Sequence, residues 1–354
     1  MTDRSPDTVS KLVTLSFGCM AISLVLTLFS VAAAEKGPSL SGNDPEQIVM
    51  EQARRSRDAH LSVDSRLGDV LHHPAFAPFS RLLLPWDDRT YDESMPLSRI
   101  GSLLPYHSHV SPHIVVSALN HMIDGARSGT IFHDIYSDAQ KRDEPARAHT
   151  GLFFFRGRPG APFAIIAPGG GFSYVGSVHE GFPHASEISK QGYNAFVLKY
   201  RAGSGGSVAM QDLAAAISHI FRSSEALGVS TDRYSLWGSS AGARMVAAIG
   251  TYGVAAYGGD DLPRPAAIVM AYTAHSDYSS ADPPTFVVVG ENDTISPPAT
   301  MGRRVAALRQ AGVEVEYHEY PNVGHGFGLG SGTSAEGWLV HAIQFWEKFV
   351  RRKP

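Results

Sequence analysis

From residue 130 onward, short apolar runs alternate with longer segments whose apolar residues recur at helical spacing. Runs such as 163–167 and 285–290 are almost wholly apolar, as is typical of strands covered on both faces. This alternation predicts an α/β fold with a mostly parallel central sheet, helices on both faces and right-handed crossovers. The expected strands are 130–136, 151–156, 163–167, 195–200, 234–237, 267–272, 285–290 and 313–320, and the expected helices are 184–191, 208–227, 241–249, 299–311 and 335–350.

Residues 35–128 lack this alternation. The segment 45–61 is polar and amphipathic, and apolar residues recur at helical spacing over 112–126. We therefore predict a helical N-terminal extension over residues 35–128 that packs on the α/β domain of residues 129–354.

An uncharged apolar segment spans residues 12–34, after Arg4 and Lys11, and it ends in small side chains. A basic start, an apolar middle and a small-residue end are typical of a secretory signal peptide. We expect residues 1–34 to be such a peptide and the protein to be exported, either to the periplasm or out of the cell. The alternative is an uncleaved membrane anchor at 12–34, because an apolar segment of this length can cross a bilayer.

Composition narrows the chemistry further. The net charge of −4 and a pI near 6.5 give no basic surface for nucleic acid. The single cysteine, Cys19, lies in the N-terminal apolar segment, so cleavage there removes disulfides, cysteine-ligated zinc and a cysteine nucleophile from consideration. The histidines at 107, 109 and 113 match no standard metal spacing, and we expect neither a metal nor a cofactor.

A G-x-S-x-G pattern is centred on Ser240, with Gly238 and Gly242 on either side. It follows an expected strand and opens an expected helix. A serine in that context lies on a sharp turn with its hydroxyl above the sheet. We predict that Ser240 is a catalytic nucleophile; a plain glycine–serine turn is the alternative.

A proline and three glycines at 168–171 follow the expected strand 163–167. Backbone N–H groups aimed at a carbonyl oxygen stabilise the negative charge that develops there in acyl transfer, and glycine lets the backbone approach a ligand. We expect an oxyanion hole made by the N–H groups of Gly170, Gly171 and Ala241. A phosphate-binding loop is disfavoured because the sequence lacks the motifs that accompany one.

Asp293 lies just past the expected strand 285–290, at the sheet edge where ligands bind in parallel α/β folds. His325 lies between two glycines in a late loop. The order Ser240, Asp293, His325 is the serine–acid–histidine order of one hydrolase fold, and we predict that Asp293 orients His325, the general base. Glu291 is the closest rival for the acid.

These motifs together resemble the α/β-hydrolase esterases, in particular the branch of acetyl and feruloyl esterases that act on decorated plant polysaccharides. The resemblance implies an α/β-hydrolase catalytic domain over 129–354 and a metal-free serine esterase that cleaves short or aromatic acyl esters, including esters on carbohydrate. Pro168 stands where hormone-sensitive-lipase-like esterases have a histidine, which favours the acetyl-esterase branch. The stretches that carry the resemblance are 168–183, 192–201, 236–243, 287–298 and 324–328.

Two alternative functions remain. A serine peptidase of the oligopeptidase type shares the triad order, although residues 35–128 are too few for its usual extra domain. A catalytically inactive hydrolase fold used for binding is the other. We expect a small-molecule or carbohydrate ester as partner, no nucleic acid, and a membrane only if residues 12–34 are uncleaved. Trp86 and its neighbours are more typical of a turn than of a sugar site. Glu180 could position substrate, but a cap for the helix beginning near Pro183 is the favoured role.

Overall fold

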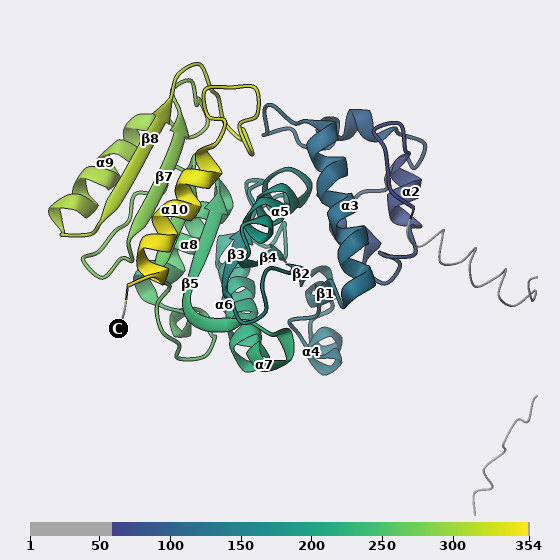
Figure 1. The fold of residues 1–354 in the computed structure, drawn as a ribbon, viewed down its shortest axis with the longest axis horizontal. Coiled ribbons are helices and arrows are strands. Elements are labelled where there is room, and N and C mark those ends of the chain that lie inside the picture. Colours follow the sequence, from purple (N-terminus) through teal and green to yellow (C-terminus); the bar gives the residue numbers. More distant parts are fainter. Residues whose placement is uncertain (1–58, 353–354) are drawn as a thin grey trace, which may run out of the picture. The chain divides into compact units, whose positions relative to one another are not determined.

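The computed structural model describes residues 59–352, and these residues build one eight-stranded sheet flanked by helices (Figure 1). The strand order is β1-β2-β4-β3-β5-β6-β7-β8; β2 runs antiparallel to β1 and β4, and all other neighbours are parallel. The predicted α/β fold with a mostly parallel sheet is confirmed. The strands are β1 Phe132–His133, β2 Gly151–Phe155, β3 Pro162–Ala167, β4 Asn194–Lys199, β5 Ser230–Ser239, β6 Ala267–Ala271, β7 Thr285–Gly290 and β8 Val315–Tyr320.

The two faces of the sheet pack against different helices. On one face Phe153 meets Phe182 of α5 edge to face, and Trp237 meets Trp346 of α10 in the same way. On the other face Phe163 contacts Phe221 of α6. The helices after β3 are α5 Phe182–Lys190, α6 Gly206–Arg222, α7 Ser224–Leu227, α8 Ala241–Tyr252, α9 Pro298–Gln310 and α10 Trp338–Val350.

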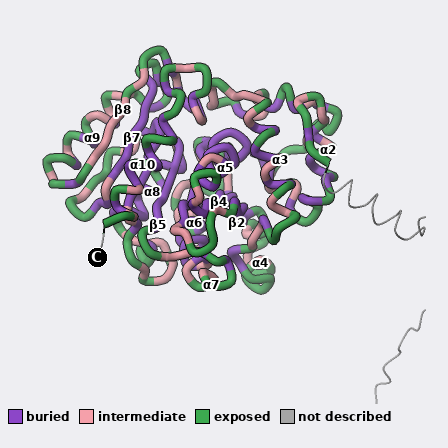
Figure 2. The backbone as a smooth tube through the Cα atoms, in the orientation of Figure 1, coloured by how far each residue is buried: buried purple, intermediate pink, exposed green. Residues whose placement is uncertain are grey.

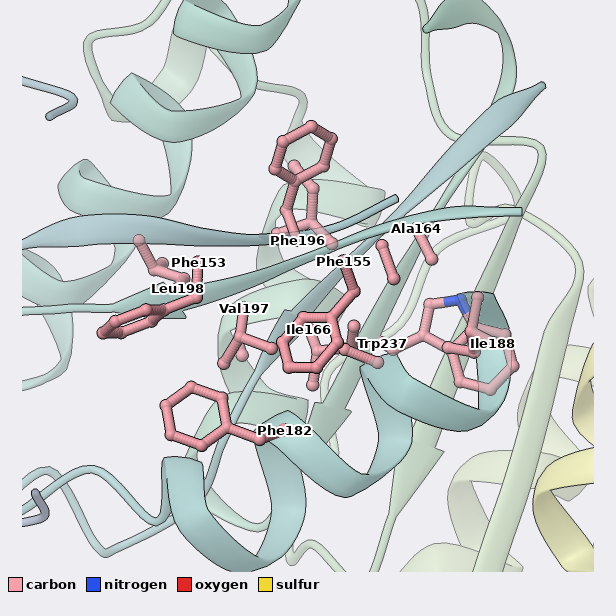
Figure 3. Close-up of a cluster of buried hydrophobic side chains, with 14 of the residues drawn as sticks. Phe153, Phe155, Ala164, Ile166, Phe182, Ile188, Phe196, Val197, Leu198 and Trp237 are labelled. Carbon is pink, nitrogen blue, oxygen red and sulfur yellow. The ribbon is translucent and has the colours of Figure 1, made fainter. Parts of the chain in front are cut away.

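Burial follows this layered arrangement (Figure 2). Every residue of β2, β4, β6 and β7 is buried, which explains why these runs are almost free of polar side chains. Figure 3 shows part of the core, in which Val197, Ile166 and Trp237 come from three adjacent strands and Phe182 comes from α5. Side chains of this size each remove a large apolar area from water, so the strands are held by their packing on both faces.

Residues 59–128 pack on the sheet domain. Helix α3 contacts α5, and the carbonyl of Pro85 accepts a hydrogen bond from the N–H of Val175 at 3.0 Å. The buried amine of Lys199 donates to the carbonyl of Leu84 at 2.9 Å. The helical elements of this extension are α2 Leu67–Leu71, the 3-10 turns η1 Ser80–Leu83 and η2 Leu97–Leu103, and α3 Pro112–Ser128.

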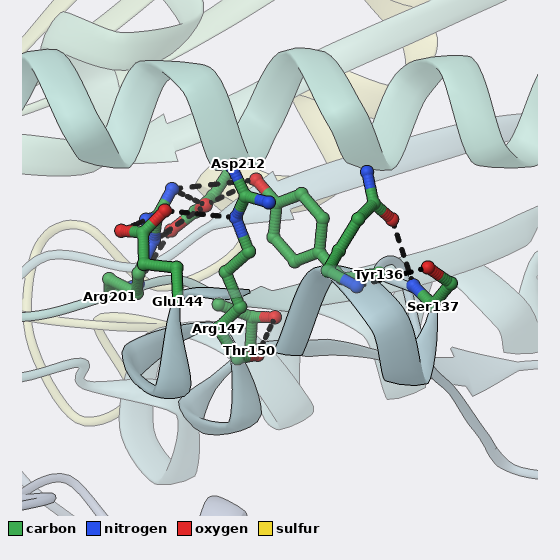
Figure 4. A network of polar contacts seen from close by, with 8 residues as sticks. Tyr136, Ser137, Glu144, Arg147, Thr150, Arg201 and Asp212 are labelled. Atoms are coloured by element: carbon green, nitrogen blue, oxygen red, sulfur yellow. Dashed lines mark hydrogen bonds and ion pairs between the residues drawn. The ribbon is translucent and has the colours of Figure 1, made fainter. Parts of the chain in front are cut away.

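A buried polar network also fixes the antiparallel edge of the sheet (Figure 4). The guanidinium of Arg201, which follows β4, donates to Asp212 of α6 at 2.6 Å and also pairs with Glu144. The hydroxyl of Tyr136 donates to the same Asp212 carboxylate at 2.7 Å. These contacts hold the turns around α4 Asp138–Asp143 and η3 Pro145–His149 against α6.

Some expected elements differ from the structure. The expected strand 130–136 is reduced to the two residues of β1, and the expected helix 208–227 is divided because Ser223 leaves helical geometry between α6 and α7. The expected helix 45–61 and residues 1–34 lie outside the described residues, except that 59–61 are not helical. Within 59–352, no helix combines the length and apolarity needed to cross a membrane.

Candidate active site

Ser240 lies on a sharp turn between β5 and α8. Its backbone is strained, with φ 50° and ψ −113°, a region that non-glycine residues seldom adopt. A Cβ atom at Gly242 would overlap the carbonyl oxygen of Ala167, and one at Gly238 would overlap the carbonyl of Gly242. Both glycines of the motif are therefore required by close backbone approach, and the turn presents the Ser240 hydroxyl at the carboxyl end of the sheet.

His325 joins Ser240 to Asp293 in one chain of hydrogen bonds. Its Nε2 lies 2.9 Å from the Ser240 Oγ, and its Nδ1 lies 2.8 Å from Oδ2 of Asp293. The other carboxylate oxygen of Asp293 accepts the N–H groups of Ile295 and Ser296 at 2.9 and 2.7 Å. The buried carboxylate thus has partners on both oxygens. The structure brings together the three residues that the sequence proposed.

Glu291, the alternative candidate for the acid, does not contact His325. It is exposed, and its carboxylate accepts the backbone N–H of Asn322 at 3.3 Å. Two residues further along, the turn after β7 points Asp293 into the protein, where it is 3% exposed.

The glycine loop after β3 lies against Ser240. A Cβ atom at Gly169 would lie 2.9 Å from the Cβ of Ser240. Gly170 and Gly171 have φ values of 130° and 62°, which favour glycine. The N–H groups of Gly170, Gly171 and Ala241 have no hydrogen-bond acceptor among residues 59–352. The loop therefore lies beside the serine at Gly169, and the two glycines that follow keep N–H groups without an acceptor within the described residues.

Glu180 has a role that its position in the sequence did not reveal. It lies in the π-helical turn η4 Ser177–Gly181, is completely buried, and accepts the N–H of Gly169 at 2.6 Å. Its other carboxylate oxygen lies 3.1 Å from Nε2 of His107. Burial alone raises the pKa of Glu180, but His107, His179 and the Gly169 N–H outweigh it and hold the pKa at about 2. The expected helix cap is wrong: the carboxylate anchors the glycine loop.

The N-terminal extension also reaches the site, through residues 104–109, which we call the bridging segment. The Ser108 hydroxyl donates to the carbonyl of His325 at 2.6 Å, and the Ser108 N–H donates to the carbonyl of Gly326 at 3.0 Å. On its other side, His107 contacts Glu180 and bonds the Tyr174 hydroxyl at 2.8 Å. The bridging segment therefore joins the histidine loop to the glycine loop, a role that no sequence motif indicated.

The site combines the kinds of group that acyl transfer requires: a serine hydroxyl hydrogen-bonded to a histidine, a buried carboxylate on the other ring nitrogen, and nearby backbone N–H groups. Between residues 59 and 352, no three histidine, cysteine, aspartate or glutamate side chains are grouped so as to hold a metal ion.

The fold and this site define the α/β-hydrolase class, and the chain has the α/β-hydrolase fold. In particular, it resembles an acetyl ester-xyloside bifunctional hydrolase from Caldicellulosiruptor lactoaceticus, with a TM-score of 0.54 and 22% identity over 61% of this chain and 95% of that one. A carboxylesterase from Lactobacillus plantarum gives a TM-score of 0.50 at 24% identity over 56% and 92% of the two chains. The resemblance to α/β-hydrolase esterases is confirmed.

Two sequence matches agree with the structural ones. The family model of the prolyl oligopeptidases matches residues 252–352, which include Asp293 and His325 but not Ser240. An acetylxylan esterase of Xylanibacter ruminicola is 23% identical over 227 residues, 56% of this chain. The match spans 47% of that enzyme's length, so about half of it has no counterpart in the alignment.

Proposed function

We propose that the protein is a serine carboxylester hydrolase that cleaves short or aromatic acyl esters, including esters on carbohydrate, through an acyl-enzyme. The observation that carries this proposal is the hydrogen-bonded chain from Ser240 through His325 to Asp293. The similarity to an acetylxylan esterase supports an ester on a sugar as one substrate class.

Acylation begins when Ser240 Oγ attacks the ester carbonyl while its proton passes to Nε2 of His325. Asp293 stabilises the imidazolium through Nδ1. The N–H groups of Gly170, Gly171 and Ala241 receive the negative oxygen of the tetrahedral intermediate. The intermediate then collapses, the bond to the alcohol oxygen breaks, and His325 returns the proton to the departing alcohol.

Deacylation repeats these steps with water as the nucleophile. His325 takes a proton from water, the hydroxide adds to the acyl carbonyl, and the bond to Ser240 Oγ breaks as the proton returns to the serine. The products are a carboxylic acid and free enzyme. No metal or cofactor enters this scheme.

The test is a fluorophosphonate probe together with a panel of acetyl, butyryl, octanoyl and feruloyl esters. The probe should label Ser240, and Ser240→Ala should lose labelling and lower kcat by about 10⁴-fold or more. Ser230→Ala is a matched control, because Ser230 pairs with Pro162 at the opposite end of the sheet, roughly 20 Å from Ser240. A wild-type protein that neither takes the probe nor cleaves any ester would overturn the proposal in favour of a binding role.

A serine peptidase of the oligopeptidase type is the second candidate, favoured by the family match to residues 252–352. The described part of the extension, 59–128, is helical and contains none of the strands of a propeller that would restrict access to peptides. Hydrolysis of a peptide p-nitroanilide without hydrolysis of p-nitrophenyl acetate would favour the peptidase.

We also propose that the protein is exported, on the basis of the apolar segment at 12–34. N-terminal sequencing of the protein from its native host distinguishes cleavage after Ala34 from an uncleaved anchor.

A further inference from the structure

We propose that Tyr106 of the bridging segment determines specificity by stacking on a ring of the substrate, either the pyranose ring of the alcohol or the aromatic ring of the acyl group. This inference rests on the proposed esterase function and names a substrate-contacting residue that lies outside the catalytic domain. Both ring types share the relevant chemistry, which is an apolar face that packs on a tyrosine ring: C–H bonds in a pyranose and π electrons in an aromatic ring.

The backbone of Tyr106 lies beside the catalytic histidine. A Cβ atom at Gly326, the residue after His325, would lie 2.8 Å from the Tyr106 carbonyl oxygen. The side chain reaches the glycine loop after β3: a Cβ at Gly171 would lie 3.2 Å from Cε2 of the Tyr106 ring. Tyr106 therefore spans the space between the histidine loop and the proposed oxyanion loop.

The Tyr106 ring is held in place and yet open to solvent. It is 44% exposed and is one of few large apolar side chains in the described structure that are exposed. One face stacks on the buried Tyr174 ring, with centroids 5.6 Å apart and planes inclined by 23°. The Tyr106 N–H also donates to the Tyr174 hydroxyl at 3.2 Å. A ring fixed in this way loses little conformational entropy when a ligand covers its free surface.

Trp86, the aromatic residue considered for a sugar site from the sequence, is too deeply buried to stack on a substrate. It is 8% exposed, its Nε1 donates to the carbonyl of Leu103 at 2.8 Å, and the Arg89 guanidinium lies 3.4 Å from its ring centroid. The Trp86 ring instead packs on Tyr174, 4.6 Å between centroids, and so supports the ring on which Tyr106 stacks.

The experiment compares kcat/KM for three esters: ethyl acetate, which has no ring; an acetylated methyl xylopyranoside, with a ring in the alcohol; and ethyl ferulate, with a ring in the acyl group. Tyr106→Ala should lower the ratio of kcat/KM for at least one ring-bearing ester to that for ethyl acetate by about five- to tenfold, mainly through KM. Tyr106→Phe should keep the wild-type ratio. The ester whose ratio falls identifies which ring stacks.

Tyr252→Ala is the matched control, because this exposed tyrosine lies at the far end of α8, roughly 18 Å along the helix from Ser240. It should leave both ratios unchanged. An equal loss on all three esters, or no change in either ratio, overturns the role of Tyr106 while leaving the esterase function intact. If the wild type cleaves none of the esters and Ser240 takes no fluorophosphonate, the proposed function itself fails.

Discussion

At the scale of single residues, the turn at Ser240 has a strained backbone, and the glycines on either side of it leave room for that conformation because they lack side chains. Ser240 adopts a positive φ, which costs of order 1–3 kcal/mol and persists only where surrounding contacts enforce it. Gly238 and Gly242 allow β3, β5 and α8 to approach closely enough to enforce it. The strain is local, and its cost is offset by the packing of the elements on either side.

Gly242→Ala should destabilise the protein by about 3 kcal/mol or more, because its Cβ would overlap the Ala167 carbonyl and force apart two buried elements. Gly302→Ala is the matched control. Gly302 lies inside α9 with open space around its Cβ position, so this change should stabilise the protein by about 0.5–1 kcal/mol through helix propensity. Urea unfolding of both variants measures the difference, and equal stabilities would contradict the overlap.

At the scale of elements, the proposed catalytic groups come from the sheet domain, and the extension holds two of their loops together. Ser108 of the bridging segment donates a hydrogen bond to the histidine loop. His107 of the same segment contacts Glu180, and the Glu180 carboxylate in turn accepts the N–H of Gly169 in the glycine loop. The ring of Tyr272, just past β6, packs edge to face on His325 at 5.2 Å. With Asp293 after β7, the bridging segment and Tyr272 thus hold His325 from three separate elements, which fixes the orientation of the proposed base.

We predict that Ser108 is a positioning residue for His325. Ser108→Ala removes one hydrogen bond to the His325 carbonyl, and should lower kcat by about three- to tenfold with little change in KM, at a cost of about 1 kcal/mol in the free energy of unfolding. Ser102→Ala is a control in the same extension, because the Ser102 hydroxyl contacts only the Met95 sulfur, at 3.7 Å. Loss of stability without a change in kcat would reduce Ser108 to a structural role.

At the scale of the whole molecule, two buried imidazoles, His179 and His184, and two half-buried ones, His133 and His275, make stability depend on pH. Burial, joined by nearby positive groups, lowers the pKa of His133, His179 and His275 to about 4, and burial does the same for His184. The unfolded chain takes up these protons near pH 6.5, whereas the folded protein resists them until about pH 4. Stability is therefore fully present above pH 6.5 and is lost as the pH falls toward 4.

Each fully buried imidazole, such as that of His184, should lower the free energy of unfolding by about 2 kcal/mol between pH 7 and pH 5. His184→Gln should remove that contribution, so the difference in unfolding free energy between the two pH values shrinks by about this amount. Urea unfolding at both pH values provides the measurement, and an unchanged difference in His184→Gln would refute the assignment.

The sequence by itself was enough to predict the sheet, most of the helices and the three residues Ser240, Asp293 and His325 that the structure brings together. Apolar periodicity reports burial directly, and motifs such as the glycines around Ser240 encode backbone geometry over a few residues. It also favoured Asp293 over Glu291 from position alone. It misplaced the edges, such as β1 and the break at Ser223, because short elements depend on contacts made elsewhere.

Only the tertiary structure decided how the extension serves the site. Ser108 and His325 are 217 residues apart, and Tyr106 and Tyr174 are 68 apart, so no local pattern links them. The sequence assigned Glu180 to a helix cap because it could not show that folding buries this carboxylate beside Gly169 and His107. Local motifs specify which groups can react, whereas contacts between distant segments determine how those groups are held and what lies beside them.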